Sequence, residues 1–244
     1  MDAEAYDRGF AQLTAHTVDP LLNLVRGSRA IRLLDVGCGT GVVTTAAVAL
    51  GADVTAADAD LDMLEVVARR QPFARVRLAE LPALPFGDGE FDAVAGNFVI
   101  NHVPDAAAAL EELHRVLRPG GTVALSWWDR EEMTATGVFA EAIAAAGLAS
   151  PPPAAPQRSP AELAALMREA GFVGVGVDTL RWRHVTDLDR WWGDVVAAGG
   201  PRFGMIAQQP AEVVERIRGE YARLAGPYAV EGFPVCAYLA HGTR

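Results

Sequence analysis

The segment LLDVGCGTG at residues 33–41 constrains the fold of this chain more than any other feature. A short apolar run ends in glycines at alternate positions, Gly37, Gly39 and Gly41, and residues 42–50 continue with helical spacing. Glycine lets the backbone turn sharply and lets a ligand lie against bare peptide, with the amino end of the next helix beneath it. The segment therefore predicts a strand, a glycine loop and a helix that bind a small ligand.

The glycine spacing argues against the best-known ligand of such a loop. A dinucleotide fingerprint needs a third glycine three residues after the second. Here Gly37 and Gly39 are followed at that place by Val42, and Gly39 and Gly41 are followed by Thr44. The sequence therefore does not match a nicotinamide-dependent dehydrogenase.

Short apolar runs alternate with helical patterns along the chain, which predicts a parallel sheet covered by helices on both faces. We expect a single α/β domain over residues 1–244, doubly wound and Rossmann-like. Strands are expected at residues 31–36, 53–57, 75–78, 91–95, 122–128, 172–185 and 235–241. Helices are expected at residues 4–25, 42–50, 61–70, 105–117, 133–148, 159–171 and 187–226, with a proline-rich linker at 151–156.

Composition excludes several classes of function. All 21 basic residues are arginine, so the chain lacks the lysine amine that Schiff-base enzymes and P-loops need. A net charge of −10 opposes binding to a phosphate backbone, so no nucleic-acid partner is expected. The acidic amino terminus is not a secretory signal and no apolar run reaches bilayer length, so we expect a cytoplasmic protein without a membrane partner. Cys38 and Cys236 are the only cysteines, and no metal is expected.

Five sequence blocks give the chain a resemblance to the class I S-adenosylmethionine-dependent methyltransferases, in particular the small-molecule group called methyltransferase type 11. The first block is LLDVGCGTG, and the resemblance is dense over residues 31–128. It implies a seven-stranded, mostly parallel sheet with an antiparallel last strand, S-adenosyl-L-methionine as cofactor and a small-molecule methyl acceptor. The other blocks are ADVTAADADLDML, AELPALPFGDGEFDAV, FDAVAGNFVINHV and HRVLRPGGTVALS.

The resemblance also implies which residues hold the cofactor. Asp35 and the glycine loop with Cys38 would hold the methionine end, and Asp58 with its neighbour Ala59 would hold the ribose hydroxyls, since a carboxylate accepts two hydrogen bonds at once. The alternative for Asp58 is a cap for the next helix. Glu80 stands where the family usually has aspartate. The resemblance places Met63, Glu80 and Leu81 against the adenine. An amino-terminal element that closes over the cofactor would contribute Tyr6, Phe10 and Thr14. The exit of the fourth strand would contribute Asn97, Phe98 and His102.

Other branches of the family fit less well. The fourth strand leads into Gly96-Asn97-Phe98-Val99 rather than the Asn/Asp-Pro-Pro-Tyr/Phe of amide and adenine N-methyltransferases, which argues against DNA and glutamine side chains as targets. No acid cluster like that of the magnesium-dependent catechol enzymes is recognisable, although Asp129 follows the fifth strand. Two alternatives stay open: the same fold performing cyclase or decarboxylase chemistry, and methylation of a protein or tRNA.

Two histidines are candidate general bases, a group that an alcohol or carbon-acid acceptor requires. His102 follows the carboxyl end of the fourth strand, where ligands bind in open α/β sheets, and His16 lies in the amino-terminal segment. Alternatively, His102 only holds the loop or lines the cofactor site. His114 is expected to be a packing residue, and His184 and His241 lie in strands distant in sequence from the glycine loop.

Tryptophans are the candidate acceptor wall. Trp127 and Trp128 end the fifth strand, so alternation sends one ring into the core and the other towards the acceptor. Trp191 and Trp192 either face the acceptor or form the core of a small cap.

We expect a helical cap made of residues 1–25, 129–157 and 187–230. Residues 187–226 are longer than a connection between two strands requires, and long insertions beyond strand ends usually carry binding function. This insertion is therefore interpreted as a lid over the acceptor, with a permanently packed cap as the alternative.

Overall fold

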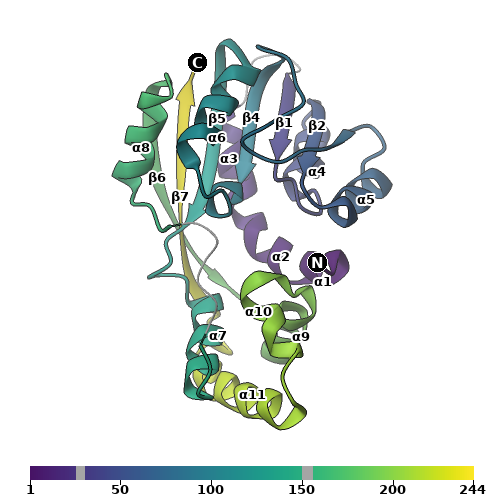
Figure 1. Cartoon of the computed structure of the whole chain (residues 1–244), viewed down its shortest axis with the longest axis vertical. Coiled ribbons are helices and arrows are strands. Elements are labelled where there is room, and N and C mark those ends of the chain that lie inside the picture. Colours follow the sequence, from purple (N-terminus) through teal and green to yellow (C-terminus); the bar gives the residue numbers. More distant parts are fainter. Residues whose placement is uncertain (26–30, 150–155) are drawn as a thin grey trace.

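The computed structural model describes residues 1–25, 31–149 and 156–244 and shows one seven-stranded sheet (Figure 1). The strand order is β3-β2-β1-β4-β5-β7-β6. Neighbours among β1 to β5 pair in parallel, whereas β7 runs antiparallel to both β5 and β6. This confirms the predicted Rossmann-like sheet and its antiparallel last strand. The strands are β1 Arg32–Val36, β2 Asp53–Asp58, β3 Arg75–Leu78, β4 Phe91–Asn97, β5 Leu117–Trp128, β6 Val173–His184 and β7 Phe233–Thr243.

Helices cover both faces of the sheet because successive strand residues point to opposite sides. Leu33 packs with α3 (Val18–Val25) and α4 (Val42–Ala49), and the next residue, Leu34, packs with α6 (Ala106–Val116) and α8 (Pro160–Glu169). Ala93 and Val94 of β4 divide in the same way, as do Ala124 and Leu125 of β5. Both faces are thus buried, as the continuous apolar runs of the strands predict. The chain also forms α5 Leu61–Arg70 and the 3-10 turn η2 Val99–Asn101.

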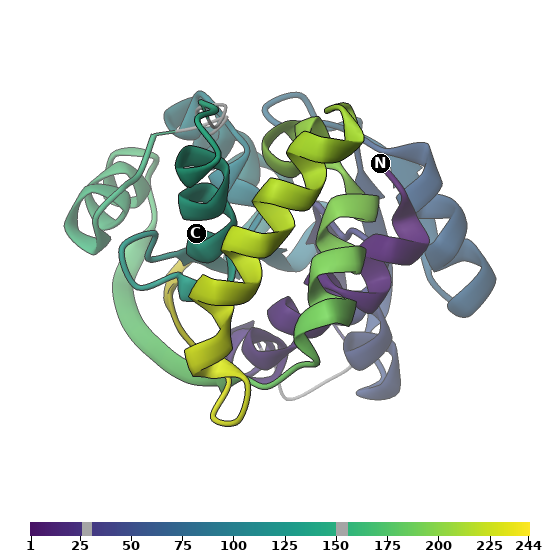
Figure 2. The ribbon, with the colours of Figure 1, turned by 90° about the horizontal axis from the view of Figure 1, so that it is seen from below.

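A second apolar cluster forms a cap beyond the carboxyl ends of the parallel strands (Figure 1). The long strands β6 and β7 run out of the sheet into this cap, where Phe233 and Val235 are buried. Figure 2 views the cap from below, with α11 lying between α7 and α9. The cap helices are α7 Thr134–Ala145, α9 Leu188–Ala198, α10 Gly200–Ala207 and α11 Ala211–Ala225, followed by the turn η3 Gly226–Tyr228.

The amino-terminal segment differs from the single helix expected at residues 4–25. It forms α1 Ala3–Arg8, α2 Phe10–Thr14, the 3-10 turn η1 Ala15–Thr17 and α3. The break falls at Gly9, where a Cβ atom would lie 3.1 Å from Cβ of Asp194. Glycine therefore favours close packing against α9, and the break lets α1 lie on α9 while α3 lies on the sheet.

Some expected elements lie outside the described residues or have different bounds. Most of the proline-rich linker at 151–156 lies outside the described residues. The predicted fifth strand at 122–128 begins earlier, at Leu117, where it already pairs with Phe91. Within the described ranges, no helix is long and apolar enough to cross a membrane.

Candidate active site

The glycine loop joins β1 to α4 and needs glycine at each of its three alternate positions. Gly37, Gly39 and Gly41 have φ values of +68°, +53° and +89°, in the left-handed region that side chains disfavour. A Cβ atom at Gly37 would also lie 2.5 Å from Cγ2 of Val99. The backbone N–H groups of Gly37 and Cys38 both donate to the carbonyl oxygen of Ala57, at 2.8 and 3.0 Å. The end of β2 thus fixes the loop at the edge of the sheet formed by the carboxyl ends of the parallel strands.

Asp58, the last residue of β2, touches this loop directly. Its Oδ2 accepts from the backbone N–H of Gly39 at 2.8 Å, and its Oδ1 accepts from that of Asp60 at 3.0 Å. Burial raises the pKa of Asp58, and these hydrogen bonds oppose the rise. The cap of α5 is Asp60, whose side chain accepts from Asp62 N–H, so the helix-cap alternative applies to Asp60. The ribose role of Asp58 stays a prediction.

Asp35 is a buried carboxylate with one oxygen unused. Its Oδ2 accepts from the Thr44 hydroxyl at 2.5 Å, and its Oδ1 is buried without a hydrogen-bond partner among the described residues. Burial raises the pKa of this carboxyl to about 7, and the Thr44 bond opposes the rise. Buried polar atoms usually have a hydrogen-bond partner, and the role of Asp35 at the methionine end of a cofactor stays a prediction.

The amino-terminal helix α1 covers the loop. The Tyr6 ring lies 3.4 Å from where a Cβ atom of Gly39 would be, and burial, with the nearby charge of Asp58, raises the pKa of Tyr6 to about 12. Two hydrogen bonds of 2.6 and 2.8 Å from Arg70 to Asp7 tie α1 to α5. These bonds hold α1 in place over the glycine loop.

The other predicted cofactor residues surround this loop to different degrees. Met63 of α5 is buried with Ala3 and against Tyr6. Glu80 and Leu81 follow Ala79, whose N–H donates to the Asp58 carbonyl oxygen at 3.0 Å, so they leave the sheet beside Asp58 and Ala59. Phe10 lies between Tyr6 and the cap, with its ring centroid 5.8 Å from that of Tyr6 and 5.6 Å from that of Trp191.

Asn97 ties the end of β4 to the amino-terminal segment. Its Oδ1 accepts from the hydroxyls of Thr17 and Ser126 at 2.7 and 2.6 Å, and its Nδ2 donates to the Thr14 carbonyl oxygen at 3.2 Å. The next residue, Phe98, has a φ of +64°. Non-glycine residues held in this region gather at functional sites because the surroundings must compensate for the strain.

The two candidate bases lie on different parts of this edge. Desolvation lowers the pKa of His102, which ends η2, and the charge of Arg130 lowers it further. Desolvation also lowers the pKa of His16, an exposed residue in η1. Both imidazoles are therefore mainly neutral at neutral pH. Their catalytic roles stay predictions.

Trp127 and Trp128 point to opposite faces of β5, as their alternation predicts. The Trp127 indole N–H donates to the Arg158 carbonyl oxygen at 3.0 Å, and its ring packs in the core near Tyr238. The Trp128 ring stacks on Phe98, with the centroids 3.6 Å apart. Of these two tryptophans, only Trp128 thus lies beside a predicted cofactor residue.

Trp191 and Trp192 are buried in the cap. The Trp191 indole N–H donates to the Ala135 carbonyl oxygen at 3.0 Å, and its ring edge meets His184. Trp192 stacks on Phe139, with centroids 5.5 Å apart. Both rings hold cap helices together, and only Trp191 reaches towards the sheet edge. Whether either contacts an acceptor stays a prediction.

Two residues of β6, Trp182 and His184, lie at this edge although the sequence predicted no site role for them. The ring of Trp182 stacks on His16, and the ring of His184 meets His16 edge-on, although His184 is remote from the glycine loop in sequence. The period of two along the strand could have placed them on one face, but no sequence signal pairs that face with His16.

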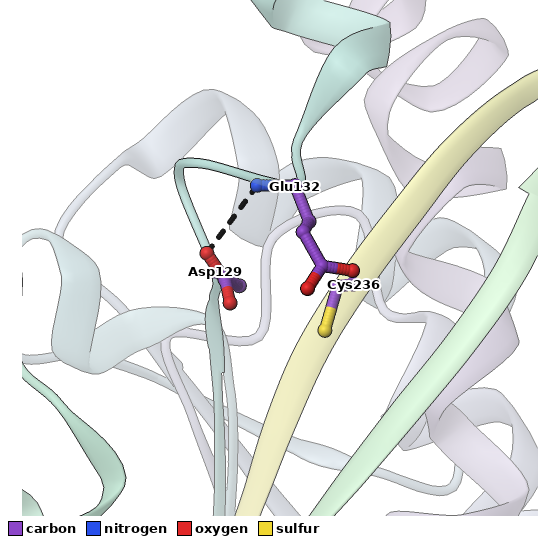
Figure 3. Close-up of side chains that lie close together, drawn as sticks. All are labelled: Asp129, Glu132 and Cys236. Carbon is purple, nitrogen blue, oxygen red and sulfur yellow. Dashed lines mark hydrogen bonds between the residues drawn. The ribbon is translucent and has the colours of Figure 1, made fainter.

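One group of metal-ligating side chains lies after β5, where Asp129, Glu132 and Cys236 come together (Figure 3). Asp129 accepts from the N–H groups of Glu131 and Glu132 and from the Tyr238 hydroxyl. Arg181 donates twice to Glu132, at 2.9 Å each. Burial raises the pKa of the Cys236 thiol. The carboxylates already have partners, so hydrogen bonds and an ion pair explain this cluster.

Comparison with known proteins identifies the domain. Residues 34–125 match the methyltransferase domain family. The chain is 38% identical over 124 residues to a malonyl-[acyl-carrier protein] O-methyltransferase of Pseudescherichia vulneris, a match that covers 51% of this chain and 49% of that protein. It is 40% identical over 95 residues to a demethylmenaquinone methyltransferase of Renibacterium salmoninarum, covering 39% and 40%. The match therefore spans about half or less of each relative's length.

Solved structures share the fold over nearly the whole chain. A SAM-dependent methyltransferase from Archaeoglobus fulgidus superposes with a TM-score of 0.62 at 14% identity, covering 98% of this chain and 97% of that one. The [4+2]-cyclase SpnF superposes with a TM-score of 0.59 at 18% identity, covering 96% and 82%. The glycine loop and the seven-stranded order agree with the match of residues 34–125, which are less than half of the chain, to the methyltransferase domain family.

Proposed function

We propose that this protein transfers a methyl group from S-adenosyl-L-methionine to an oxygen, nitrogen or carbon atom of a small molecule. The observation that carries the proposal is the juxtaposition of three glycines with positive φ, Asp58 bonded to the loop, and the buried oxygen of Asp35 that has no partner among the described residues. These features fit a ligand with an amino-acid end and a ribose.

The residues present suit each part of that ligand. The Asp35 oxygen and the loop glycines would hold the methionine end, and Asp58 with Ala59 would hold the ribose. The adenine would lie against Met63 and the segment at Glu80 and Leu81. Tyr6, Phe10 and Thr14 would close the site, with Asn97, Phe98 and His102 at the end of β4.

When bound, S-adenosylmethionine supplies an electrophilic methyl group on a sulfonium. Charge disperses as such a methyl moves to a neutral nucleophile, so this chain's main tasks are to align the acceptor and exclude water. The cap and α1 would provide the cover. An acceptor that must lose a proton would use His102 or His16, since both imidazoles are held mainly neutral.

The names of the relatives define the range of acceptors to try. One relative is named for malonyl-[acyl-carrier protein] and another for demethylmenaquinone. The net charge of −10 favours a small molecule over nucleic acid. We propose an acceptor from specialised metabolism and a cytoplasmic site of action.

A second candidate function is cyclase chemistry on the same fold. The observation that favours it is the structural likeness to a protein titled a [4+2]-cyclase, which is a likeness of fold alone. A protein or tRNA acceptor is the remaining alternative, and the acidic charge opposes tRNA.

Product analysis tests the proposal. The protein is incubated with isotopically methyl-labelled S-adenosylmethionine and a panel of thioester carboxylates, quinols, phenols and amines. Methyl transfer predicts labelled acceptor and an equal amount of S-adenosylhomocysteine. Conversion of an acceptor without S-adenosylhomocysteine would instead support the cyclase alternative and contradict the proposal.

A further inference from the structure

Five aromatic side chains from distant parts of the sequence meet between the sheet edge and the cap. We call them the ring cluster: His16, Trp128, Trp182, His184 and Trp191. Trp182 stacks on His16 with centroids 5.4 Å apart and lies 6.0 Å from Trp128. The His184 ring is 6.3 Å from His16 and 4.9 Å from Trp191.

Two nitrogen atoms in the ring cluster are buried without a hydrogen-bond partner within the described part of the chain. They are Nε1 of Trp182 and Nε2 of His184, and the His184 residue is only 5% exposed. An unpartnered buried polar atom is costly because it has lost its bonds to water, and such atoms are rare in folded proteins. By contrast, the indole N–H groups of Trp127 and Trp191 both have carbonyl partners.

The two nitrogens belong to one surface. Trp182 and His184 are two residues apart on β6, so their side chains point to the same side of the strand. Arg181 and Arg183, which alternate with them, point away and are exposed. A single small molecule between the sheet and the cap could therefore meet both nitrogens.

The ring cluster starts beside two of the predicted cofactor residues, Asn97 and Phe98, at the end of β4. Trp128 stacks on Phe98, the residue directly after β4. Thr17, next to His16, donates to Asn97 Oδ1 at 2.7 Å. A molecule in contact with the ring cluster would thus lie one side chain from the end of β4.

His16 covers the ring cluster and is its exposed member. Its ring lies over Trp182 on the short turn η1 and is held there by stacking, without a side-chain hydrogen bond in the described residues. A flat ligand could replace this imidazole on the Trp182 ring by displacing one exposed side chain.

We propose that Trp182 and His184 bind the methyl acceptor, and that this acceptor is a flat, uncharged aromatic molecule bearing a hydroxyl group, of the phenol or quinol class. The inference rests on the proposed function and specifies its substrate class. The Trp182 N–H donates to the acceptor oxygen, and the His184 Nε2 accepts the hydroxyl hydrogen. With His16 displaced, the ring of Trp182 supports the flat face of the acceptor.

The charge state of His184 agrees with an uncharged ligand. Burial, with the neighbouring His16, lowers the pKa of His184 to about 4. The imidazole is therefore neutral at neutral pH and offers no positive charge to a carboxylate. A phenolic hydroxyl, which can both donate and accept, satisfies both nitrogens at once.

The test uses the full chain loaded with S-adenosylhomocysteine and three probes: 2-naphthol, naphthalene and 2-naphthoate. Dissociation constants are measured by ligand-observed NMR for the wild type, Trp182→Phe and His184→Phe. Each variant keeps an aromatic ring: Trp182→Phe removes the indole nitrogen, and His184→Phe removes both imidazole nitrogens. His114→Phe is the matched control, because His114 packs on Phe172 on the opposite face of the sheet.

We expect 2-naphthol to bind the wild type more tightly than naphthalene or 2-naphthoate. Trp182→Phe and His184→Phe should each weaken 2-naphthol binding more than tenfold, with little change for naphthalene, and His114→Phe should leave it unchanged. Unchanged 2-naphthol affinity in Trp182→Phe, or tighter binding of 2-naphthoate, would overturn the inference.

Two further outcomes separate this inference from the proposed function. If S-adenosylhomocysteine binds but 2-naphthol does not, ordered water satisfies the two nitrogens and the inference fails while the proposed function stands. If S-adenosylhomocysteine itself does not bind the wild type, the proposed function fails as well. Should His184→Phe not fold, Trp182→Phe decides the question alone.

Discussion

Replacing Asp35 by asparagine tests whether the buried carboxylate of Asp35 destabilises the folded protein when no cofactor is bound. The asparagine side chain can still accept the Thr44 hydroxyl hydrogen bond, so the change mainly removes the charge. The folded-state pKa of Asp35, about 7, lies above its ordinary value of 3.8 because of burial. The folded state therefore holds the proton more tightly than the unfolded state, and stability is lost as pH rises from about 4 to about 7.

The size of the effect follows from the shift. A shift from 3.8 to about 7 corresponds to about 4 kcal/mol once Asp35 is ionised in both states, at 1.36 kcal/mol per pKa unit. Part of that penalty, about 1.5 kcal/mol, already applies near pH 5. The unfolding free energy of the wild type, relative to Asp35→Asn, should therefore fall by about 2.5 kcal/mol between about pH 5 and about pH 8.

The assay is urea unfolding of both proteins without cofactor across this pH range. The difference between the two curves cancels the carboxylates that they share, such as Asp92, whose pKa its arginine partners hold low. Saturating S-adenosylhomocysteine should reduce the pH dependence for the wild type only, because its ammonium group would pair with the ionised Asp35. Parallel stability curves for the two proteins, or a difference of opposite sign, would refute the reasoning.

Three other changes test the site and the cap. Asp58→Ala should weaken S-adenosylmethionine binding by about 1.5–3 kcal/mol in calorimetry, the range for charged hydrogen bonds, and an unchanged dissociation constant would remove Asp58 from the ribose. Gly37→Ala, whose Cβ would lie 2.5 Å from a Val99 methyl, should weaken cofactor binding more than tenfold, whereas Gly51→Ala, at φ +82° with open space around it, should only lower thermal stability. Trp191→Ala and Trp192→Ala should each cost about 3–5 kcal/mol of unfolding free energy as buried aromatics. At least one of these two should raise the acceptor KM more than tenfold with cofactor affinity nearly unchanged, and normal acceptor kinetics in both would argue for a purely structural cap.

The sheet and glycine loop were predictable because local rules dictate them. Glycine is needed wherever φ is positive, as at Gly37, and alternating burial follows from strand geometry, as at Trp127 and Trp128. The antiparallel last strand followed only from the family resemblance. These features depend on residues close together in sequence or on a shared motif.

Features that depend on contacts between distant segments were not predictable. The break at Gly9 lies against α9, and no local pattern in the sequence indicates that contact. Trp191 fits a cap core or an acceptor wall equally well by composition, and its bond to the Ala135 carbonyl oxygen appears only once the helices are assembled. His184 is remote in sequence from the glycine loop and from His16, and its contact with His16 depends on the path of the long strand β6.

Calorimetric titration of the wild-type protein with S-adenosylmethionine, S-adenosylhomocysteine and NAD tests the central claim most directly. The loop, Asp58 and the unpartnered Asp35 oxygen predict saturable binding of the first two ligands, one per chain, and no binding of NAD. Binding of NAD without binding of either sulfur-containing ligand would contradict the account.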